Sequence, residues 1–372
     1  MKRIKIVADS KIPYLKGVLE PFAEVVYLSP EQIDREAVKE ADALIIRTRT
    51  KCDGALLDGS RVKMIATATI GFDHIDREYC REEGIVWKNA PGCNAASVAQ
   101  YILCSLSLLM MERGEKLSDK TIGIVGVGNV GRTVEKECRL LGMNVLRCDP
   151  PRAKAEGPEG FVSLETIAHQ ADIITFHTPL TRDGETPTYH MADAGFFEKV
   201  VGKPVIINTS RGEVIEENAL KGAFRSGQIS EMIIDCWEHE PDIDSDLMGE
   251  TFLSTPHIAG YSADGKSNAT RMAVSNIADF FGLEPDLSGI VPPAIEEGRI
   301  DAAAYSENGL GNILLRTYDP RQDSARLRKS RVTFEKQRGD YPLRREYRAF
   351  TVVNPQTSDI PVLKDLGFNV IG

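Results

Sequence analysis

Three glycines and one aspartate have the residue types and spacing of a dinucleotide-binding loop. Gly126, Gly128 and Gly131 follow an apolar run, and Asp149 comes about 20 residues later, after a second apolar run. The first glycine permits a tight turn, the second lets a pyrophosphate approach the backbone, and the third lets a helix pack closely on a strand. An acid at Asp149 can accept hydrogen bonds from ribose hydroxyls and repel a 2′-phosphate. The pattern therefore favours NAD over NADP.

The elements that must position these residues are a strand, a helix and a second strand. Residues 122–127 form an apolar run that is typical of a buried parallel strand, and residues 144–148 predict the next one. Between them, apolar residues recur at helical spacing. The N-terminus of that helix offers unpaired N–H groups and partial positive charge to phosphates. Asn129 and Val130 lie at this N-terminus, so we expect them to contact the cofactor as well.

Length and composition limit the possible classes of protein. A chain of 372 residues is long enough for two or three domains of about 150 residues each. Its net charge of −10 argues against nucleic acid as a partner. The seven cysteines include no C-x-x-C pair, so we expect neither a disulfide framework nor a metal site, and a reducing cytoplasm fits best. The N-terminus does not resemble a signal peptide, and the apolar run 101–111 is too short to span a bilayer, so we expect no membrane contact and a buried helix.

The order of the elements predicts an α/β fold with two Rossmann-like, doubly wound parallel-sheet domains. Short apolar runs alternate with helical or turn segments in both halves, which implies parallel sheets. A helix over residues 263–281 should return to the first domain, which is then discontinuous. The expected domains are 1–94 with 257–281, 95–256, and 282–372. The predicted strands besides those named above are 4–8, 25–28, 43–46, 64–66, 86–88, 173–176, 204–208 and 232–234.

Two loops of the first domain are candidates to face a ligand. Residues 47–50, Arg-Thr-Arg-Thr, and residues 67–74 each follow a predicted strand. Ligands of open α/β sheets bind at the carboxyl ends of strands, and arginine with threonine suits an anionic, oxygen-rich ligand. Arg47, next to its strand, is the stronger candidate, whereas a solvated side chain is an equal alternative for Arg49.

Further motifs carry a resemblance to a known family. Asn208-Thr-Ser-Arg-Gly212, Asp235-Cys-Trp-Glu-His-Glu-Pro241 and Thr255-Pro-His-Ile258, together with the glycine loop, resemble the D-isomer-specific 2-hydroxyacid dehydrogenases. The resemblance covers residues 1 to about 281. It implies that Arg211, Glu240 and His257 are the catalytic residues.

The chemistry of such a reaction agrees with these three residue types. Oxidising a 2-hydroxy acid needs a base for the hydroxyl proton while hydride leaves the same carbon, and a cation for the neighbouring carboxylate. An imidazole exchanges protons near neutral pH, so His257 is the expected base. Glu240 would favour the imidazolium and orient the ring. Arg211 would clamp the carboxylate with its planar fork.

The segments Pro150-Pro151-Arg152 and Ala259-Gly260-Tyr261 resemble one branch of the family, whose substrate is a phosphorylated 2-hydroxy acid. Alternatives are a 3-phosphoglycerate or other D-2-hydroxyacid dehydrogenase, and a non-catalytic, NAD-sensing binding protein like the corepressors built on this fold. The resemblance implies that substrate contacts come from Thr48, Thr69 and Tyr261, and that NAD contacts come from Asp149, Thr178, Thr209, Ser210, Asp235 and Gly260.

The last 90 or so residues predict a small α+β domain behind a proline-rich linker. We expect strands at 312–318, 348–353 and 368–371 and a helix at 360–366. Segment 320–348 is strongly basic within an acidic chain, and its charge could be a solvated surface, a contact to an acidic partner subunit or a contact to the substrate phosphate. A domain this small buries its apolar strands more easily against a copy of itself, and the resemblance also implies a dimerisation domain, so we expect a homodimer.

Overall fold

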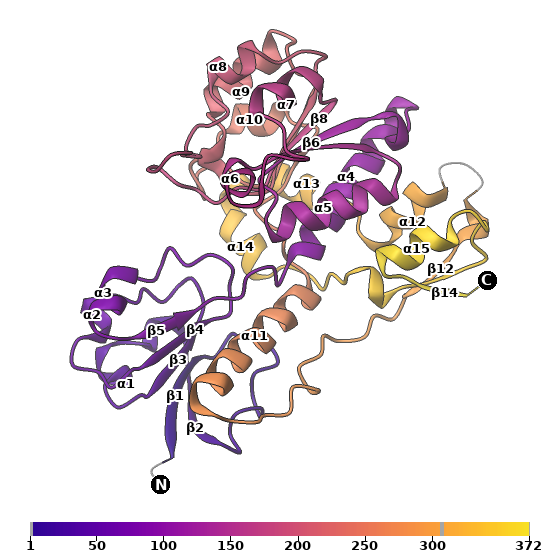
Figure 1. Cartoon of the computed structure of the whole chain (residues 1–372). Helices are drawn as coiled ribbons and strands as arrows, with labels where there is room; N and C mark the ends of the chain where they lie inside the picture. The colour runs from indigo at the N-terminus through magenta and orange to yellow at the C-terminus, as the bar shows by residue number, and fades with distance from the viewer. Residues whose placement is uncertain (1–2, 306–308, 372) are drawn as a thin grey trace. The chain divides into compact units, whose positions relative to one another are not determined.

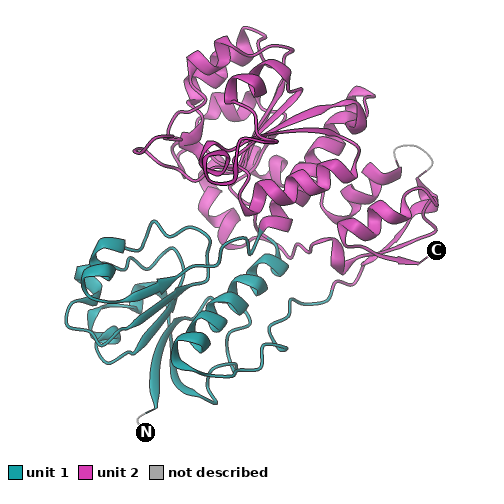
Figure 2. Cartoon of the chain, viewed as in Figure 1, with its two compact units in different colours: residues 1–94, 262–294 teal, residues 95–261, 295–372 magenta. Residues whose placement is uncertain are grey.

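The computed structural model describes residues 3–305 and 309–371 and divides into two compact units. Unit 1 comprises residues 1–94 and 262–294, and unit 2 comprises residues 95–261 and 295–372 (Figure 2). Each unit has its own parallel sheet and its own apolar core. The division into three domains that the sequence suggests stays a prediction, because these units are defined by compactness alone.

Unit 1 contains a five-stranded parallel sheet in the order β2-β1-β3-β4-β5. Two of its inner strands, β3 and β4, are short, mostly apolar runs that are buried on both faces, as parallel strands require. Helix α11, Ala263–Phe281, packs against β4, so the chain returns to this unit late in the sequence as expected (Figure 1). The other elements are β1 Ile4–Asp9, β2 Ala23–Leu28, β3 Ala43–Ile46, β4 Met64–Thr67, β5 Val86–Lys88, α1 Arg35–Val38, α2 Gly54–Leu57 and α3 Arg77–Glu82.

Unit 2 contains a six-stranded parallel sheet in the order β11-β10-β9-β8-β6-β7. The two sheets confirm the predicted α/β class with two Rossmann-like folds. The short edge strand β11 was not predicted, because two residues carry no periodic signal. The elements are β6 Thr121–Val125, β7 Asn144–Cys148, β8 Ile173–Phe176, β9 Val205–Asn208, β10 Glu231–Ile234, β11 Leu253–Ser254, α4 Ala95–Arg113, α5 Asn129–Leu140, α6 Pro150–Glu156, α7 Leu164–Gln170, α8 Ala194–Glu198, α9 Glu217–Arg225 and α10 Ser245–Glu250.

Helix α4 is the main core helix of unit 2. Its length and composition alone would allow it to cross a membrane, but 83% of its most apolar window is buried inside the protein. Tyr101, Ile102 and Leu103 have no exposed surface and join the largest apolar cluster. The helix therefore contributes to the core of the fold, as the sequence indicated.

The C-terminal part of unit 2 adds a three-stranded parallel sheet, β12-β13-β14. The strand predicted at 312–318 is wrong, because this segment is helix α12, whose buried residues Ile313, Leu314 and Thr317 have helical spacing. The predicted strand 348–353 is shorter, since a 3-10 turn occupies Tyr347–Ala349. The elements are β12 Arg299–Asp301, β13 Thr351–Val353, β14 Asn369–Ile371, α12 Gly309–Thr317, α13 Pro320–Lys329, α14 Phe334–Gly339 and α15 Ile360–Leu366.

A buried carboxyl group on α5 should make the stability of the protein depend on pH. Glu137 is 6% exposed, and its Oε2 has no hydrogen-bond partner among the described residues. Burial raises the pKa of Glu137 to about 8, with Lys136 opposing and Glu346 reinforcing the shift. The pKa of this carboxyl group is 4.5 in the unfolded state and about 8 in the folded state. Between these two pH values the folded state holds a proton that the unfolded state lacks, so the free energy of unfolding falls as the pH rises through this window.

Glu137→Gln is therefore expected to raise the free energy of unfolding at pH 8, by about 2–4 kcal/mol. At pH 5 the gain should be small, because the native carboxyl group is then already protonated. Urea denaturation at the two pH values measures the difference. An equal gain at both would show that Glu137 is not protonated in the folded state.

Candidate active site

The register of the sheet in unit 2 brings several predicted site residues to one edge. Val125 pairs with Phe176, Phe176 with Asn208, and Asn208 with Ile234, so β6, β8, β9 and β10 all end at the same level. The carboxyl edge of a parallel sheet is where α/β proteins bind ligands. The residues that follow these strands at this edge are Gly126, His177, Thr178, Thr209, Ser210 and Asp235.

At two positions of the glycine loop a side chain would collide with the protein itself, and at the third it would meet no other atom. Gly126 has a φ of 88°, and a Cβ there would lie 2.8 Å from the His177 carbonyl oxygen. A Cβ on Gly131 would lie 2.1 Å from the Gly126 carbonyl oxygen. A Cβ on Gly128 would meet nothing within 4 Å. The space beside Gly128, at the N-terminus of α5, fits a diphosphate that approaches the backbone.

A pair of glycine substitutions separates packing from cofactor binding. Gly131→Ala should lower the melting temperature and weaken NAD binding at least tenfold, because the new methyl group collides with a carbonyl oxygen. Gly128→Ala, as the matched control, should leave the melting temperature unchanged and weaken only NAD binding. Thermal denaturation and NADH fluorescence titration measure the two properties. Equal loss of stability in both variants would contradict this assignment.

Asp149 is held beside the glycine loop by backbone donors. Its Oδ2 accepts the Val127 N–H at 2.8 Å and its Oδ1 accepts the Arg152 N–H at 3.0 Å. Each oxygen keeps a second lone pair for a ribose hydroxyl. The Arg152 guanidinium pairs with Glu156 at 2.6 Å, so this neighbouring cation is already neutralised. The arrangement suits a ribose without a 2′-phosphate.

Asn208 shapes the loop that carries Arg211. The Asn208 Nδ2 donates to the Arg211 carbonyl oxygen at 2.9 Å, and its Oδ1 accepts the Ser210 N–H at 3.1 Å. A Cβ on Gly212 would lie 1.9 Å from the Trp237 carbonyl oxygen. The Arg211 loop is therefore pressed against the segment that follows β10. The position of Asn208 at a strand end, before small polar residues, was a signal for this role.

Asp235 organises the loop that carries His257. The Asp235 carboxylate is buried and accepts from the Ile258 N–H at 2.7 Å, the Ala259 N–H at 2.9 Å and the Thr255 hydroxyl at 2.7 Å. Burial raises the pKa of Asp235, against the opposing charge of His257 and these hydrogen bonds. His257 itself has a φ of 55°, in the left-handed region that non-glycine residues rarely adopt. The contact of Asp235 with nicotinamide stays a prediction.

His257 and Glu240 form a hydrogen-bonded pair. The His257 Nδ1 lies 2.8 Å from Glu240 Oε2, and Glu240 Oε1 also accepts the Trp237 N–H at 3.0 Å. Burial alone would raise the pKa of Glu240, but the hydrogen bond and charge of His257 lower it below its usual value. Because an ionised Glu240 accepts from Nδ1, the Nε2 of His257 is left as the proton acceptor.

The spacing of this pair and a neighbouring thiol would also allow a metal ion. Ligand atoms of Cys236, Glu240 and His257 lie within 4.8 Å of one another. Burial raises the pKa of the Cys236 thiol well above its usual value in the absence of a metal ion. Glu240 and His257 already bond each other at 2.8 Å as a carboxylate–imidazole pair.

Sequence reasoning missed the structural role of His177. Its Nε2 lies 3.0 Å from the Thr175 hydroxyl, and its Nδ1 lies 3.5 Å from the Thr209 hydroxyl. Burial lowers the pKa of His177 to about 3, so the ring is neutral. It links the ends of β8 and β9 next to Thr178. Its place directly after a predicted strand was the available signal.

The substrate residues predicted from the first domain lie in unit 1. Arg47 donates its Nε to Asp9 Oδ2 at 2.9 Å, so a buried carboxylate fixes the guanidinium. Asp9, at the end of β1, was not predicted. Thr48 lies in the turn closed by the hydrogen bond from the Thr50 N–H to the Arg47 carbonyl. Thr69 donates to the Gly71 carbonyl at 3.0 Å within the loop after β4.

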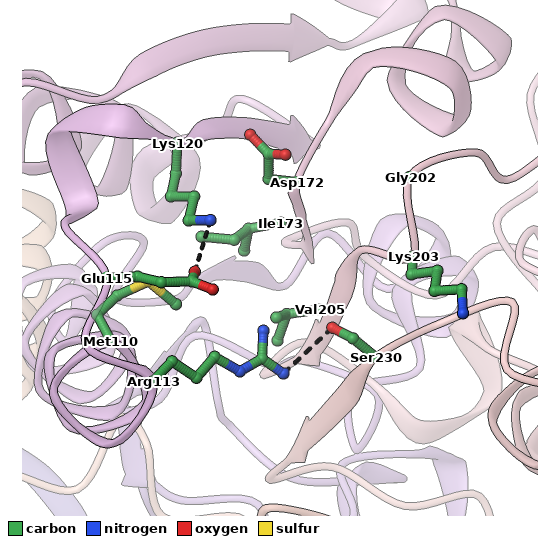
Figure 3. A pocket seen from close by; sticks show the side chains of 10 residues that line it. All are labelled: Met110, Arg113, Glu115, Lys120, Asp172, Ile173, Gly202, Lys203, Val205 and Ser230. Carbon is green, nitrogen blue, oxygen red and sulfur yellow. Dashed lines mark hydrogen bonds and ion pairs between the residues drawn. The ribbon is translucent and has the colours of Figure 1, made fainter.

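A pocket of about 250 Å³ lies at the opposite edge of the unit 2 sheet (Figure 3). Lys120 and Asp172 line it and directly precede β6 and β8. Two of its basic side chains have polar partners: Lys120 contacts Glu115 at 2.6 Å, and Arg113 donates to the Ser230 hydroxyl at 3.3 Å (Figure 3). This pocket is therefore separate from the predicted site, which occupies the carboxyl edge.

Comparisons with known proteins agree with this geometry. Residues 108–259 match the family model for the NAD binding domain of D-isomer specific 2-hydroxyacid dehydrogenases. The NAD⁺-bound 3-phosphoglycerate dehydrogenase of Entamoeba histolytica is 30% identical with a TM-score of 0.62, and the match covers 75% of this chain and 95% of that one. The D-lactate dehydrogenase of Aquifex aeolicus, complexed with NAD and lactic acid, is 23% identical with a TM-score of 0.60 over 74% of this chain and 95% of that one, and it shows the fold alone. Fold and site thus define a NAD-binding 2-hydroxyacid dehydrogenase.

Relatives that match over nearly the whole chain narrow this class. The erythronate-4-phosphate dehydrogenase of Bacteroides fragilis is 54% identical over 94% of this chain and 99% of its own, and that of Porphyromonas gingivalis is 44% identical over 98% and 100%. The chain belongs to the erythronate-4-phosphate dehydrogenase branch of the D-isomer specific 2-hydroxyacid dehydrogenase family. Residues 290–367 also match a domain of unknown function. The family resemblance seen in the sequence is confirmed.

Proposed function

We propose that this protein oxidises C2 of 4-phospho-D-erythronate with NAD, giving (R)-3-hydroxy-2-oxo-4-phosphooxybutanoate, in pyridoxine 5′-phosphate (vitamin B6) biosynthesis. The observation that carries the proposal is the His257–Glu240 pair, at 2.8 Å, beside a sheet edge suited to a dinucleotide. Near-full-length similarity to proteins named for this substrate supports it. When bound, NAD supplies the hydride acceptor.

Each site residue has a separate role in the proposed reaction. His257 Nε2 accepts the proton of the C2 hydroxyl, and Glu240 stabilises the imidazolium that forms. Arg211 holds the carboxylate and the developing carbonyl oxygen. The substrate contacts are Arg47, Thr48, Thr69 and Tyr261, and the NAD contacts are Gly126, Gly128, Asn129, Val130, Gly131, Asp149, Thr178, Thr209, Ser210, Asp235 and Gly260.

A comparison of two substrates tests the proposal. Purified protein is assayed with 4-phosphoerythronate and with 3-phosphoglycerate, and a 2-oxoacid is supplied in case NAD stays bound. A large preference in kcat/KM for 4-phosphoerythronate is expected. The similarity to the Entamoeba enzyme makes 3-phosphoglycerate the specific competitor. Turnover of neither substrate by folded, NAD-binding protein would favour a binding protein instead.

We also propose that the protein is a cytoplasmic homodimer. The supporting observation is exposed apolar surface after residue 295, where Val332, Leu343 and Ile371 are 89%, 52% and 57% exposed. Residues 282–372 would then be the dimerisation domain. Light scattering of the full-length protein after size-exclusion chromatography would give twice the chain mass of 41.0 kDa if this is right.

A further inference from the structure

The C-terminal part of unit 2 fixes the segment that follows His257. The buried guanidinium of Arg344 donates its Nη1 to the carbonyl oxygens of Ile258 at 3.4 Å and Ala259 at 3.2 Å. Its Nη2 donates to the Ser97 carbonyl of α4 at 2.5 Å, and its Nε donates to Gln100 Oε1 at 3.1 Å. One side chain thus ties residues 258–259 to the core helix.

The same part of the chain also contacts Tyr261. The Tyr341 ring packs edge-to-face on the Tyr261 ring, with centroids 5.8 Å apart. The Tyr341 and Tyr318 hydroxyls both donate to Asp323 Oδ2, at 2.7 Å and 2.8 Å. These bonds hold Tyr341, and through it the Tyr261 ring, in a defined position.

Arg338 places a cation beside Tyr261. The Arg338 Cζ lies 5.8 Å from the Tyr261 ring centroid, and its side chain is 22% exposed. Its Nη1 pairs with Glu335 at 2.8 Å, but its Nε is buried without a partner in the part of the chain that the structure describes. Against the effect of burial, the pKa of Glu240 is lowered mainly by the hydrogen bond and charge of His257, and the charge of Arg338 adds to this shift. The Arg338 side chain is only partly exposed, and a partly buried guanidinium favours a contact with a further anion.

The proposed substrate has two anionic ends. Arg211 is proposed to hold the carboxylate at C1, so the phosphate at C4 needs a further cation, for which Arg47 and Arg338 are the two candidates. The match to the 2-hydroxyacid dehydrogenase domain ends at residue 259, and Arg338 belongs to the added region at 290–367. An added region that brings a cation to Tyr261 can distinguish a phosphorylated substrate from an unphosphorylated one.

We infer that Arg338 binds the C4 phosphate of the substrate, so that the C-terminal region takes part in substrate selection. This inference rests on the proposed function. An arginine–phosphate contact contributes enough binding free energy that its loss should lower kcat/KM about 10- to 100-fold.

The test compares phosphorylated and unphosphorylated substrates of the same carbon skeleton. Arg338→Met should lower kcat/KM for 4-phosphoerythronate about 10- to 100-fold and that for erythronate less than about threefold. Arg338→Lys keeps the positive charge but cannot make two parallel hydrogen bonds, so its kcat/KM for 4-phosphoerythronate should lie between those of the wild type and Arg338→Met. Lys336→Met is the matched control, because Lys336 lies on the same helix with its side chain 74% exposed, and it should leave both values unchanged.

Two outcomes would overturn the inference. The first is an equal loss with both substrates, which would make Arg338 merely structural. The second is an unchanged preference for phosphate in Arg338→Met, which would assign the phosphate to another cation such as Arg47.

Calorimetric binding of 4-phosphoerythronate to the NADH-loaded protein separates this inference from the proposed function. The wild-type protein could bind 4-phosphoerythronate without turning it over. If Arg338→Met then weakens that binding, the proposed function is refuted and the phosphate site is kept. Failure of the wild-type protein to bind would refute both.

Discussion

Replacing His257 with alanine is expected to lower kcat by about 10³-fold or more, while NAD still binds. In the proposed mechanism the imidazole accepts the hydroxyl proton, and its loss leaves only water to do so. The loop at Asp235, a predicted NAD contact, should keep its position without the imidazole ring. The His257 backbone N–H, which the substitution retains, donates to the Asp235 carbonyl oxygen at 2.8 Å. Steady-state kinetics and NADH titration measure the two effects.

His169→Ala is the control for this substitution, since His169 is an exposed histidine on α7. Glu240→Gln should lose less activity than His257→Ala, and the double variant should lose no more than His257→Ala alone, because the two residues act as one unit. Near-normal turnover of His257→Ala would remove the base assignment.

Replacing Arg211 with lysine is expected to raise the substrate KM about 10- to 100-fold. Lysine keeps the charge, but it cannot make two parallel hydrogen bonds to a carboxylate. The loop geometry should survive, because Asn208 holds the Arg211 main chain even if the guanidinium's own bond to the Ser210 carbonyl, at 2.8 Å, is lost. KM for 4-phosphoerythronate and the dissociation constant of NADH are the two measurements.

Arg225→Lys serves as the control for Arg211→Lys, since Arg225 lies on α9 and its side chain is 55% exposed. An unchanged KM in Arg211→Lys would show that the guanidinium does not hold the carboxylate. A weakened NADH affinity without a change in KM would assign Arg211 to the cofactor instead.

Local patterns were enough to predict much of the fold. Buried parallel strands are mostly apolar runs, so β3 and β8 could be recognised from a few residues each. The helical spacing in α12 was also present, but its apolar residues lie close together and were interpreted as a strand. Short segments allow both interpretations until a neighbour determines which face is buried.

Sequence patterns alone predicted the two sheets and the glycine loop, because these depend on residues that are close together, and the family resemblance supplied the candidate catalytic residues. Tertiary structure decided the rest. Asp9 binds Arg47, Arg344 binds the carbonyls of residues 258 and 259, and Arg338 lies beside Tyr261. The partners in each of these contacts are far apart in the chain. Only folding brings them together, so no local pattern could predict them.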